Sequence, residues 1–503
     1  MIERNKYCGI DIGPSSSVLF LGNNPIIMPT CVGFTRLKQM KVGDSALDVL
    51  RQERILSMKH RSKQESNVFN NFFRGRKGNK ELFSSNMERS YSQEELLSIV
   101  IAKLAGDSDF EKNGRCVFTV PASAKPDMLL SLNRAAISAG LDSVSFMLKP
   151  LAACYACGLP NSDEEARWLV VDFGRDSLEV SLAGVSRRSM RLIDSAFSDT
   201  IGGSLIDSII VDECLLPHLR KNYRLSSSLF SNPEKVSLAK EALLHYAVKA
   251  KEEISSKEQI DILSQEDEFG DDDCGTPVEL DLTLTKGQLE ALEMPVFKRA
   301  VKFISAFLSK HSEGEDGVDK LILIGGASLS PLFKKLVREA VKDGSVAKQP
   351  DPVTVAARGA SLFALKLEKD ANDEQYQEWV ATEKNLKKEM RFLEKANKEC
   401  GGKYDGQLEV LHKSLEDLSA DPDFNVADDL LKKIGDLYDQ ASYGKRLSAF
   451  VLYRKALFDQ FNWIDQDRAH ILIDEARNVI ASINPDIDLL EEKCACILEC
   501  ERV

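Results

Sequence analysis

The chain has 503 residues, of which 43% are hydrophobic and 29% charged, and its formal net charge is −13. This composition is ordinary for a globular protein of about two to four domains and excludes a mostly disordered or fibrous chain. The negative charge argues against general affinity for nucleic acid, whose phosphates it would repel. No apolar stretch approaches the ~20 residues of a membrane span, no signal peptide is evident, and the cysteines are scattered. We therefore expect a cytoplasmic protein with free thiols.

Short β-rich runs alternate with amphipathic helical stretches over the first two thirds of the chain. The runs are YCGIDIG, SVLFLG, RCVFTVPA, RWLVVDFG, LEVSLAG and KLILIGGA. This alternation predicts an α/β domain. The acidic segment SQEDEFGDDDCGTP (264–277) lies between two β-like runs and predicts a long, solvated hairpin loop.

The pattern changes at about residue 368, where strand-like runs vanish. Apolar residues then recur at three- and four-residue spacing, as at Trp379, Met390 and Leu393, and the breaks CGGKYDG, SADPDF and SINPD divide the region into several helices. Residues 371–503 carry −10 of the net charge of −13. We expect an all-helical C-terminal domain over 371–503, in which Trp379 and Trp463 belong to the core of a helical bundle.

Two strand–turn–strand segments about 160 residues apart each contain an Asp-x-Gly turn. Such a turn can direct backbone N–H groups and hydroxyls at a phosphate, while its carboxylate can hold hydrated magnesium. A single hairpin of this kind is more often an ordinary turn, but two copies indicate a duplicated nucleotide-binding core. The candidate residues are Asp11, Gly13, Ser15 and Ser16 in the first hairpin, and Asp172, Gly174 and Ser177 in the second.

Several blocks, taken in order over about residues 7–367, resemble the actin-fold ATPases and most closely the seventy-kilodalton heat-shock chaperones of the DnaK type. The blocks include GIDIGPSSSVLFL, MPTCVGF, KVGDSA, ILSMKHRSK, LVVDFGRDSLEVSL, DTIGGSLID and LILIGGASLSPLFKKLV. The resemblance implies an α/β, two-lobed actin-like (ribonuclease H-like) ATPase fold, with lobe I over 1–160 and lobe II over 161–367. It also implies that MPTCVGF and KVGDSA are strands that follow the first loop.

The resemblance further implies the residues of a nucleotide site in the cleft between the lobes. The catalytic set would be Asp11, Lys59, Asp172 and Ser177, and Asp11 and Asp172 would hold magnesium through water. ATP or ADP would contact Gly13, Ser15, Ser16, Gly174, Gly202, Gly203, Lys251, Ser255, Gly325 and Gly326.

Other positions depart from the family pattern. Pro14 replaces a threonine, which removes a hydroxyl and an N–H group from the phosphate cradle. Lys149 replaces a glutamate that helps hold the water shell of magnesium, so it places an ammonium where the family has a carboxylate. The remaining departures are Arg175 and Asp176 in place of glycines, and Val248, Glu252 and Leu329 in place of adenine-contacting side chains. Together they leave nucleotide binding favoured and predict slow hydrolysis.

No β-rich segment follows the ATPase part, so the β-sandwich with which this family grips peptides is missing. We therefore predict a divergent heat-shock-type, ATP-binding chaperone or cochaperone whose helical tail contacts a protein client or cochaperone, with no nucleic acid or membrane as partner. One alternative is a nucleotide-locked scaffold or exchange factor without turnover. The other is a small-molecule kinase of the same superfamily, which is disfavoured because the sequence offers no acceptor-site base besides the two loop aspartates.

Overall fold

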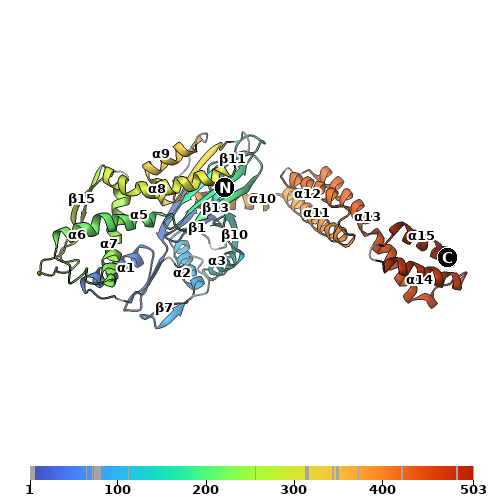
Figure 1. Ribbon diagram of the computed structural model, residues 1–503, viewed down its shortest axis with the longest axis horizontal. Coiled ribbons are helices and arrows are strands. Elements are labelled where there is room, and N and C mark those ends of the chain that lie inside the picture. Colours follow the sequence, from blue (N-terminus) through green and yellow to red (C-terminus); the bar gives the residue numbers. More distant parts are fainter. Residues whose placement is uncertain are drawn as a thin grey trace. The chain divides into compact units, whose positions relative to one another are not determined.

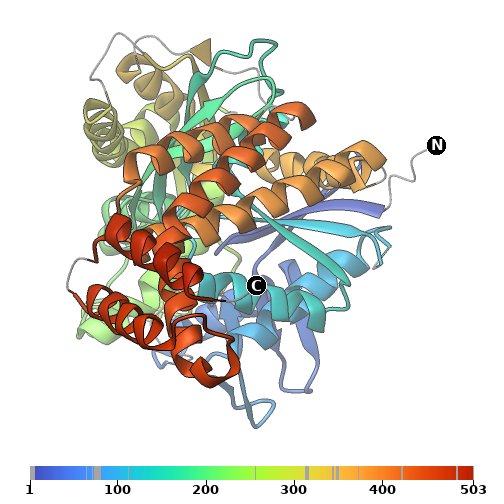
Figure 2. The ribbon, with the colours of Figure 1, turned by 90° about the vertical axis from the view of Figure 1, so that its right-hand side faces the viewer.

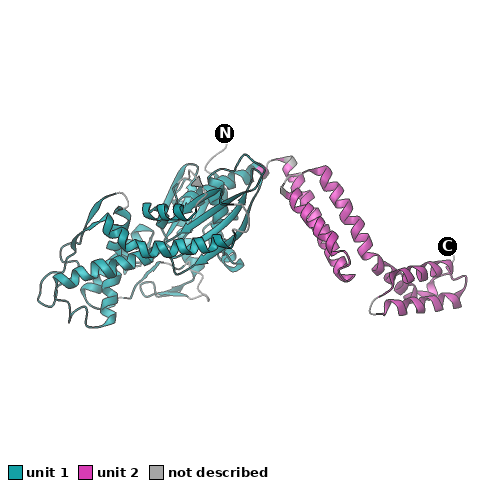
Figure 3. Ribbon diagram, turned by 45° about the horizontal axis from the view of Figure 1, so that its top comes forward, with its two compact units in different colours: residues 1–369 teal, residues 370–503 magenta. Residues whose placement is uncertain are grey.

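The computed structural model contains two compact units, residues 1–369 and 370–503 (Figure 3). It describes residues 6–63, 65–70, 72, 81–111, 113–254, 257–311, 317–341, 345–346, 351–371, 373–420, 423–482 and 485–501. Within these residues, no helix is both long enough and apolar enough to cross a membrane.

Two five-stranded sheets form the centre of the first unit, one in each lobe (Figure 1). The sheet of lobe I has the order β10-β9-β1-β2-β3, and that of lobe II has the order β13-β12-β11-β16-β17. The strands of lobe I are β1 (Tyr7–Ile12), β2 (Ser16–Leu21), β3 (Asn24–Pro29), β9 (Arg115–Val120) and β10 (Ser143–Leu148). Those of lobe II are β11 (Ala166–Phe173), β12 (Leu178–Val185), β13 (Met190–Ser198), β16 (Lys320–Ile324) and β17 (Ser345–Val346).

The two sheets share one topology. In each, three strands follow one another as an antiparallel meander. A later strand pairs in parallel with the first strand of the meander, and a last strand pairs in parallel with that one. Each of the six strands expected from the β-rich runs is present, and the duplicated two-lobed α/β fold is confirmed. The expectation of a strand at KVGDSA is wrong for most of that block, because β5 (Met40–Val42) ends there and α1 begins at Asp44.

Helices and shorter strands surround the two sheets of this unit. The short strands are β4 (Cys31–Phe34), β6 (Val68–Asn70), β7 (Leu82–Ser84), β8 (Arg89–Tyr91), β14 (Gln259–Leu263) and β15 (Asp281–Thr285). The helices are α1 (Asp44–Lys59), α2 (Gln93–Gly106), α3 (Pro126–Ser138), α4 (Lys149–Ala156), α5 (Gly203–Ile210), η2 (Val211–Leu215), α6 (Leu216–Asn222), α7 (Pro233–Ile254), α8 (Lys286–Ser309), η3 (Gly326–Leu329), α9 (Pro331–Ala340) and α10 (Val355–Ala371).

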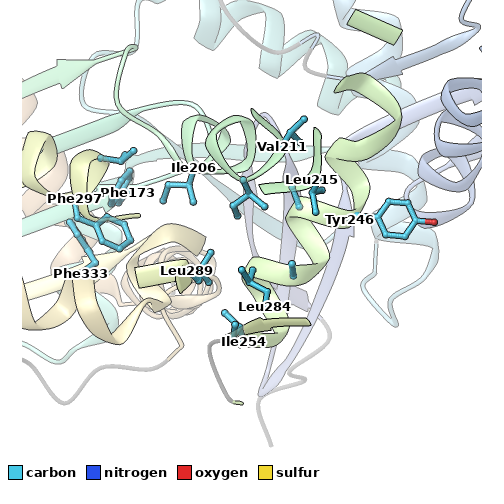
Figure 4. Close-up of a cluster of buried hydrophobic side chains, with 14 of the residues drawn as sticks. Phe173, Ile206, Val211, Leu215, Tyr246, Ile254, Leu284, Leu289, Phe297 and Phe333 are labelled. Atoms are coloured by element: carbon cyan, nitrogen blue, oxygen red, sulfur yellow. The ribbon is translucent and has the colours of Figure 1, made fainter. Parts of the chain in front are cut away.

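An aromatic trio supports the end of β11 in the core of lobe II (Figure 4). The ring of Phe173, the last residue of β11, lies 4.7 Å from that of Phe333 and 6.0 Å from that of Phe297, measured between centroids. Phe297 belongs to α8 and Phe333 to α9, and all three side chains are almost wholly buried. Because edge-to-face aromatic pairs favour one geometry, the trio fixes the direction in which the chain leaves β11.

The acidic segment between β14 and β15 is largely exposed, as the sequence suggested, but one part of it is buried. The two strands do pair as an antiparallel hairpin. Phe269 in the loop, however, is fully buried in the lobe II core, and Glu268 is buried as well. A loop that carries an aromatic side chain gains apolar burial by folding back onto the protein, and this gain outweighs the solvation of its neighbouring carboxylates.

Helices alone make up the described part of the second unit (Figure 2). Aspartates cap four of them, because the side chains of Asp373, Asp423, Asp465 and Asp486 accept hydrogen bonds from N–H groups of the first turn. The helices are α11 (Glu374–Glu399), α12 (Asp405–Ala420), α13 (Phe424–Ala456), η4 (Phe458–Gln460), α14 (Gln466–Ile480) and α15 (Ile487–Glu499).

This unit has two hydrophobic cores, so a single bundle core is a wrong expectation. Trp379 packs in one core with residues of α11, α12 and the first part of α13. Trp463 packs against the other core, which the last part of α13 forms with α14 and α15. The length of α13, 33 residues, allows one helix to take part in both cores.

We propose that residues 370–503 form an independent domain, and we expect them to fold when expressed alone. Both cores of the unit are built from its own helices, so burial of their apolar residues does not require lobes I and II. Circular dichroism should give a strongly helical spectrum that is lost in a cooperative thermal transition. A disordered spectrum would show that the helices depend on residues 1–369.

Candidate functional site

The two Asp-x-Gly hairpins are closed by the same hydrogen bond. In the first, the N–H of Gly13 donates to the carbonyl of Ser16 at 2.9 Å, and in the second the N–H of Gly174 donates to the carbonyl of Ser177 at 3.0 Å. Asp11 lies at the end of β1 and Asp172 near the end of β11, so the carboxylates occupy corresponding positions in the two lobes. The structure therefore contains the duplicated hairpins expected from the sequence.

Thr30 supports the first hairpin from its outer side. Its hydroxyl donates to the carbonyl of Gly13 at 2.7 Å and lies 2.7 Å from the hydroxyl of Ser17, while its N–H donates to the carbonyl of Ser15 at 3.0 Å. These contacts hold the turn although Pro14 contributes no N–H group.

Lys149 links the two hairpins. Its Nζ lies 2.8 Å from Oδ2 of Asp172 and 3.3 Å from Oδ2 of Asp11. The lysine side chain is 19% exposed, and those of Asp11 and Asp172 are 11% and 17% exposed. A lysine, one carboxylate from β1 and one from β11 thus form a largely buried ion triad at the junction of the lobes.

The triad keeps Lys149 charged. Burial by itself would lower the pKa of Lys149, but the carboxylates of Asp11 and Asp172 raise that pKa well above its usual value. Lys149 is also the first residue of α4, where the helix dipole disfavours a cation. The two short contacts to carboxylates therefore have to offset both burial and the dipole.

Strand register places two further polar residues at the triad. Thr119 of β9 lies opposite Asp11, and its hydroxyl donates to Oδ1 of that aspartate at 2.5 Å. Glu179 of β12 lies opposite Asp172 and is buried; its carboxylate accepts the N–H of Ser123 at 3.2 Å. Burial raises the pKa of Glu179, and the charge of Asp172 raises it further.

The sequence motifs did not identify Glu179 and Thr119 as site residues. The available signal was the polar residue in the apolar strand pattern LEVSL, since a buried strand seldom carries a carboxylate without a partner. Thr119 gave no comparable signal, because its role depends on the parallel pairing of β9 with β1.

Two Gly-Gly turns close around the second hairpin. The N–H of Gly203 donates to the carbonyl of Gly174 at 3.0 Å, and a Cβ atom on Gly202 would lie only 2.4 Å from the carbonyl oxygen of Arg175. Gly325 has φ +87°, and a Cβ atom on it would likewise lie only 2.4 Å from the carbonyl oxygen of Phe173. These close approaches require glycine, which explains the residue type at both turns.

A pocket lies beside these turns, between α7, α8 and the start of α9. Its lining includes Lys251, Glu252, Glu293, Gly326 and Leu329. The ammonium of Lys251 is hydrogen-bonded to the buried carboxylate of Asp207 and to the carbonyl of Gly203, so it joins the pocket to the second hairpin. Ser255, which the sequence placed in this region, lies outside the described residues.

Lys59, which the resemblance placed in the catalytic set, forms an ion pair with Asp267. It is the last residue of α1, and its Nζ lies 2.7 Å from Oδ2 of Asp267 and 3.1 Å from the carbonyl of the same residue. Asp267 belongs to the loop between β14 and β15. The structure therefore brings together Asp11, Asp172 and the glycine turns, while Lys59 is engaged by this loop.

The carboxylates at the triad do not offer the arrangement that magnesium requires. Mg²⁺ prefers about six oxygen ligands in octahedral geometry, but Oδ2 of both aspartates faces the ammonium of Lys149 and Oδ1 of Asp11 accepts from Thr119. In the part of the chain that the structure describes, no three carboxylate, imidazole or thiol groups gather as a metal site. The metal role expected for Asp11 and Asp172 stays a prediction, and these contacts argue against it.

We expect folding stability to depend on the ionisation of Glu293. This pocket residue is 5% exposed, and burial raises its pKa from 4.5 to about 7. A carboxyl group whose pKa rises on folding destabilises the folded state. This penalty grows as the pH increases from the pKa of the group in the unfolded protein to its pKa in the folded protein. Replacing Glu293 with Gln should remove this penalty. The free energy of unfolding of the variant, measured by denaturation, should therefore increase relative to that of wild type by up to about 3 kcal/mol between about pH 5 and about pH 8.

The matched control is Glu258→Gln, because the side chain of Glu258 is 88% exposed in the same lobe. Its stability relative to wild type should be the same at both pH values. A Glu293→Gln variant that also shows no pH-dependent gain would mean that the carboxyl titrates normally in the folded protein.

A family model described as Hsp70 protein matches residues 27–375. The chaperone protein DnaK of Cenarchaeum symbiosum (strain A) is 26% identical over 371 residues, which cover 71% of this chain and 54% of that protein. The chaperone protein DnaK of Nitrosopumilus maritimus (strain SCM1) is 26% identical over 366 residues, which cover 71% and 56% of the two chains.

The chaperone protein DnaK of Methanothermobacter thermautotrophicus (strain ATCC 29096 and synonyms) is 25% identical over 382 residues, covering 72% of this chain and 60% of that protein. The chain thus spans less than two thirds of the length of these relatives. The family model matches more than half of this chain, and the matched residues contain Lys149, the second hairpin and both Gly-Gly turns. The chain therefore belongs to the Hsp70 protein family.

Proposed function

We propose that the protein is a divergent ATP-binding molecular chaperone or cochaperone, with ATP or ADP held between its two lobes. The observation that carries this proposal is the convergence of two Asp-x-Gly hairpins with two Gly-Gly turns, each of which has one position, Gly202 or Gly325, with no room for a side chain. Such turns expose backbone N–H groups to a ligand without obstruction by side chains, as phosphate binding requires. The relatives named as DnaK chaperones support the chaperone class.

The nucleoside would occupy the pocket beside Gly326 and Lys251. Its lining combines apolar side chains, such as Phe297 and Leu329, with a few charged ones, such as Glu252 and Glu293. Apolar walls with a few oriented polar groups are typical of sites for small organic ligands. Because Lys251 bonds to the carbonyl of Gly203, a ligand in this pocket would lie next to the phosphate-binding turns.

A nucleotide-bound scaffold or exchange factor with little turnover is the second candidate, and two contacts favour it. Lys149 pairs with both loop aspartates, and Lys59 pairs with Asp267. Phosphoryl transfer depends almost entirely on positioning and on stabilisation of the developing charge. With these charged groups paired within the protein, we propose that any hydrolysis by the predicted set of Asp11, Lys59, Asp172 and Ser177 is slow.

We further propose that the partners are proteins, clients or cochaperones, and that they contact helices α11–α15. The net charge of −13 disfavours nucleic acid as a partner, and we place the protein in the cytoplasm. The helical unit is a separate compact body with its own cores, which suits a module that engages another protein.

Nucleotide binding should be detectable by thermal shift. A ligand that binds only the folded state stabilises it by mass action, so saturating ATP or ADP should raise the melting temperature by a few degrees. Asp11→Ala should reduce this increase because it disrupts the triad, whereas Asp107→Ala, which alters an exposed surface ion pair of the same lobe, should not. If neither nucleotide raises the melting temperature, the protein is not a nucleotide-binding chaperone.

Single-turnover hydrolysis should be slow in the wild type and faster in Lys149→Glu. The substitution changes the local charge by about two units in a partly dry site, where charge effects on phosphoryl transfer are large. We expect an increase of about tenfold or more, with a further gain when Pro14→Thr is added. Wild-type hydrolysis at an ordinary chaperone rate, unchanged by Lys149→Glu, would refute slow turnover.

A further inference from the structure

The triad of Lys149, Asp11 and Asp172 contains a cation supplied by the protein itself. An ammonium has three N–H donors, and two of them face the two Oδ2 atoms at 2.8 and 3.3 Å. Within the described residues, Lys149 forms ion pairs with these two aspartates, so the third N–H donor of its ammonium faces neither carboxylate. The lysine therefore both joins the two carboxylates and retains a donor for an anionic ligand.

The oxygens around the ammonium leave little room for a second cation. Oδ1 of Asp11 accepts the hydroxyl of Thr119. Oδ1 of Asp172 has no hydrogen-bond partner within the described parts of the chain, but it is buried and lies close to Gly325, where a Cβ atom would approach it to 2.7 Å. A divalent cation bound here would lie near the ammonium, and like charges at short range in a buried site repel strongly.

Further positive charge lies at the second hairpin. Arg175 follows Gly174 directly and is exposed, and no ion pair of its guanidinium is found within the described ranges. The charge of Arg175 also affects Arg54 of α1. Burial lowers the pKa of Arg54, the carboxylate of Glu241 raises it, and the charge of Arg175 lowers it. The two positive charges disfavour each other, and a bound anion would relieve this repulsion.

We propose that Lys149 takes the place of a divalent cation in this site, so that the protein binds ATP and ADP as metal-free anions. The proposal rests on the nucleotide binding proposed above. Lys149 neutralises the two loop aspartates in part and donates to a phosphate oxygen, and Arg175 adds a bidentate donor at the hairpin. Magnesium held by ATP in solution would then be released, or left outside the site, when the nucleotide binds.

The test is equilibrium binding of ATP and of ADP to the full chain by titration calorimetry, once with excess magnesium and once with excess EDTA. We expect the wild-type chain to bind both nucleotides in EDTA at least as tightly as in magnesium, because excess magnesium competes with the site for the metal-free nucleotide. Binding that is strong with magnesium and lost in EDTA would overturn the inference while leaving the proposed function intact. If neither buffer supports binding, both the inference and the proposed function fail.

Substitutions then assign the effect to Lys149. Lys149→Met should weaken binding in EDTA by about tenfold or more, because the aspartates would face the phosphates without a counter-charge. Lys149→Glu should abolish binding in EDTA and make it depend on magnesium. Lys103→Met is the matched control, since Lys103 pairs with one aspartate on the exposed surface of the same lobe, and it should behave as wild type. Metal-independent binding that survives Lys149→Met would overturn the role assigned to this lysine.

Discussion

The ammonium of Lys149 between the carboxylates of Asp11 and Asp172 is the contact on which the arrangement of the candidate site depends. Asp11 and Asp172 are the next-to-last residues of corresponding strands in the two lobes, and Lys149 is the first residue of a helix that lies between these strands in the sequence. Two carboxylates brought this close would repel each other in a largely buried setting. The lysine reverses that repulsion and so allows the two hairpins to face one another.

The backbone of the site is supported independently of these charges. Thr30 holds the first hairpin through the carbonyls of Gly13 and Ser15, and the ring of Phe173 anchors the second hairpin in an aromatic cluster. The glycine turns approach the second hairpin too closely for any side chain. The departure at Lys149 thus changes the charge of the site, while both hairpins and both glycine turns are present. Phosphoryl transfer requires charge to be placed at the transition state as well as a site that holds the nucleotide, so binding and turnover can differ in this protein.

A second set of charged contacts joins the lobes at α1. Lys59 pairs with Asp267, and the guanidinium of Arg61 donates to the carbonyls of Phe269 and Asp271. The buried ring of Phe269 fixes this loop, so the loop presents its acidic residues and carbonyls to α1 in a defined position. Lys59 is thereby engaged by this loop, whereas Lys149 places its ammonium between the two loop aspartates.

The sequence by itself determined six main strands, the Asp-x-Gly and Gly-Gly turns and the helical nature of residues 371–503. These features follow from apolar spacing and from the backbone freedom of glycine, which are properties of neighbouring residues. Only the tertiary structure decided the partners of Lys149 and Lys59, the positions of Thr119 and Glu179 at the triad, the burial of Phe269 and the division of the helical unit into two cores. A long side chain can reach several partners, and a strand residue gains its neighbour from pairing with a distant segment, so these contacts are set by which segments meet rather than by local pattern.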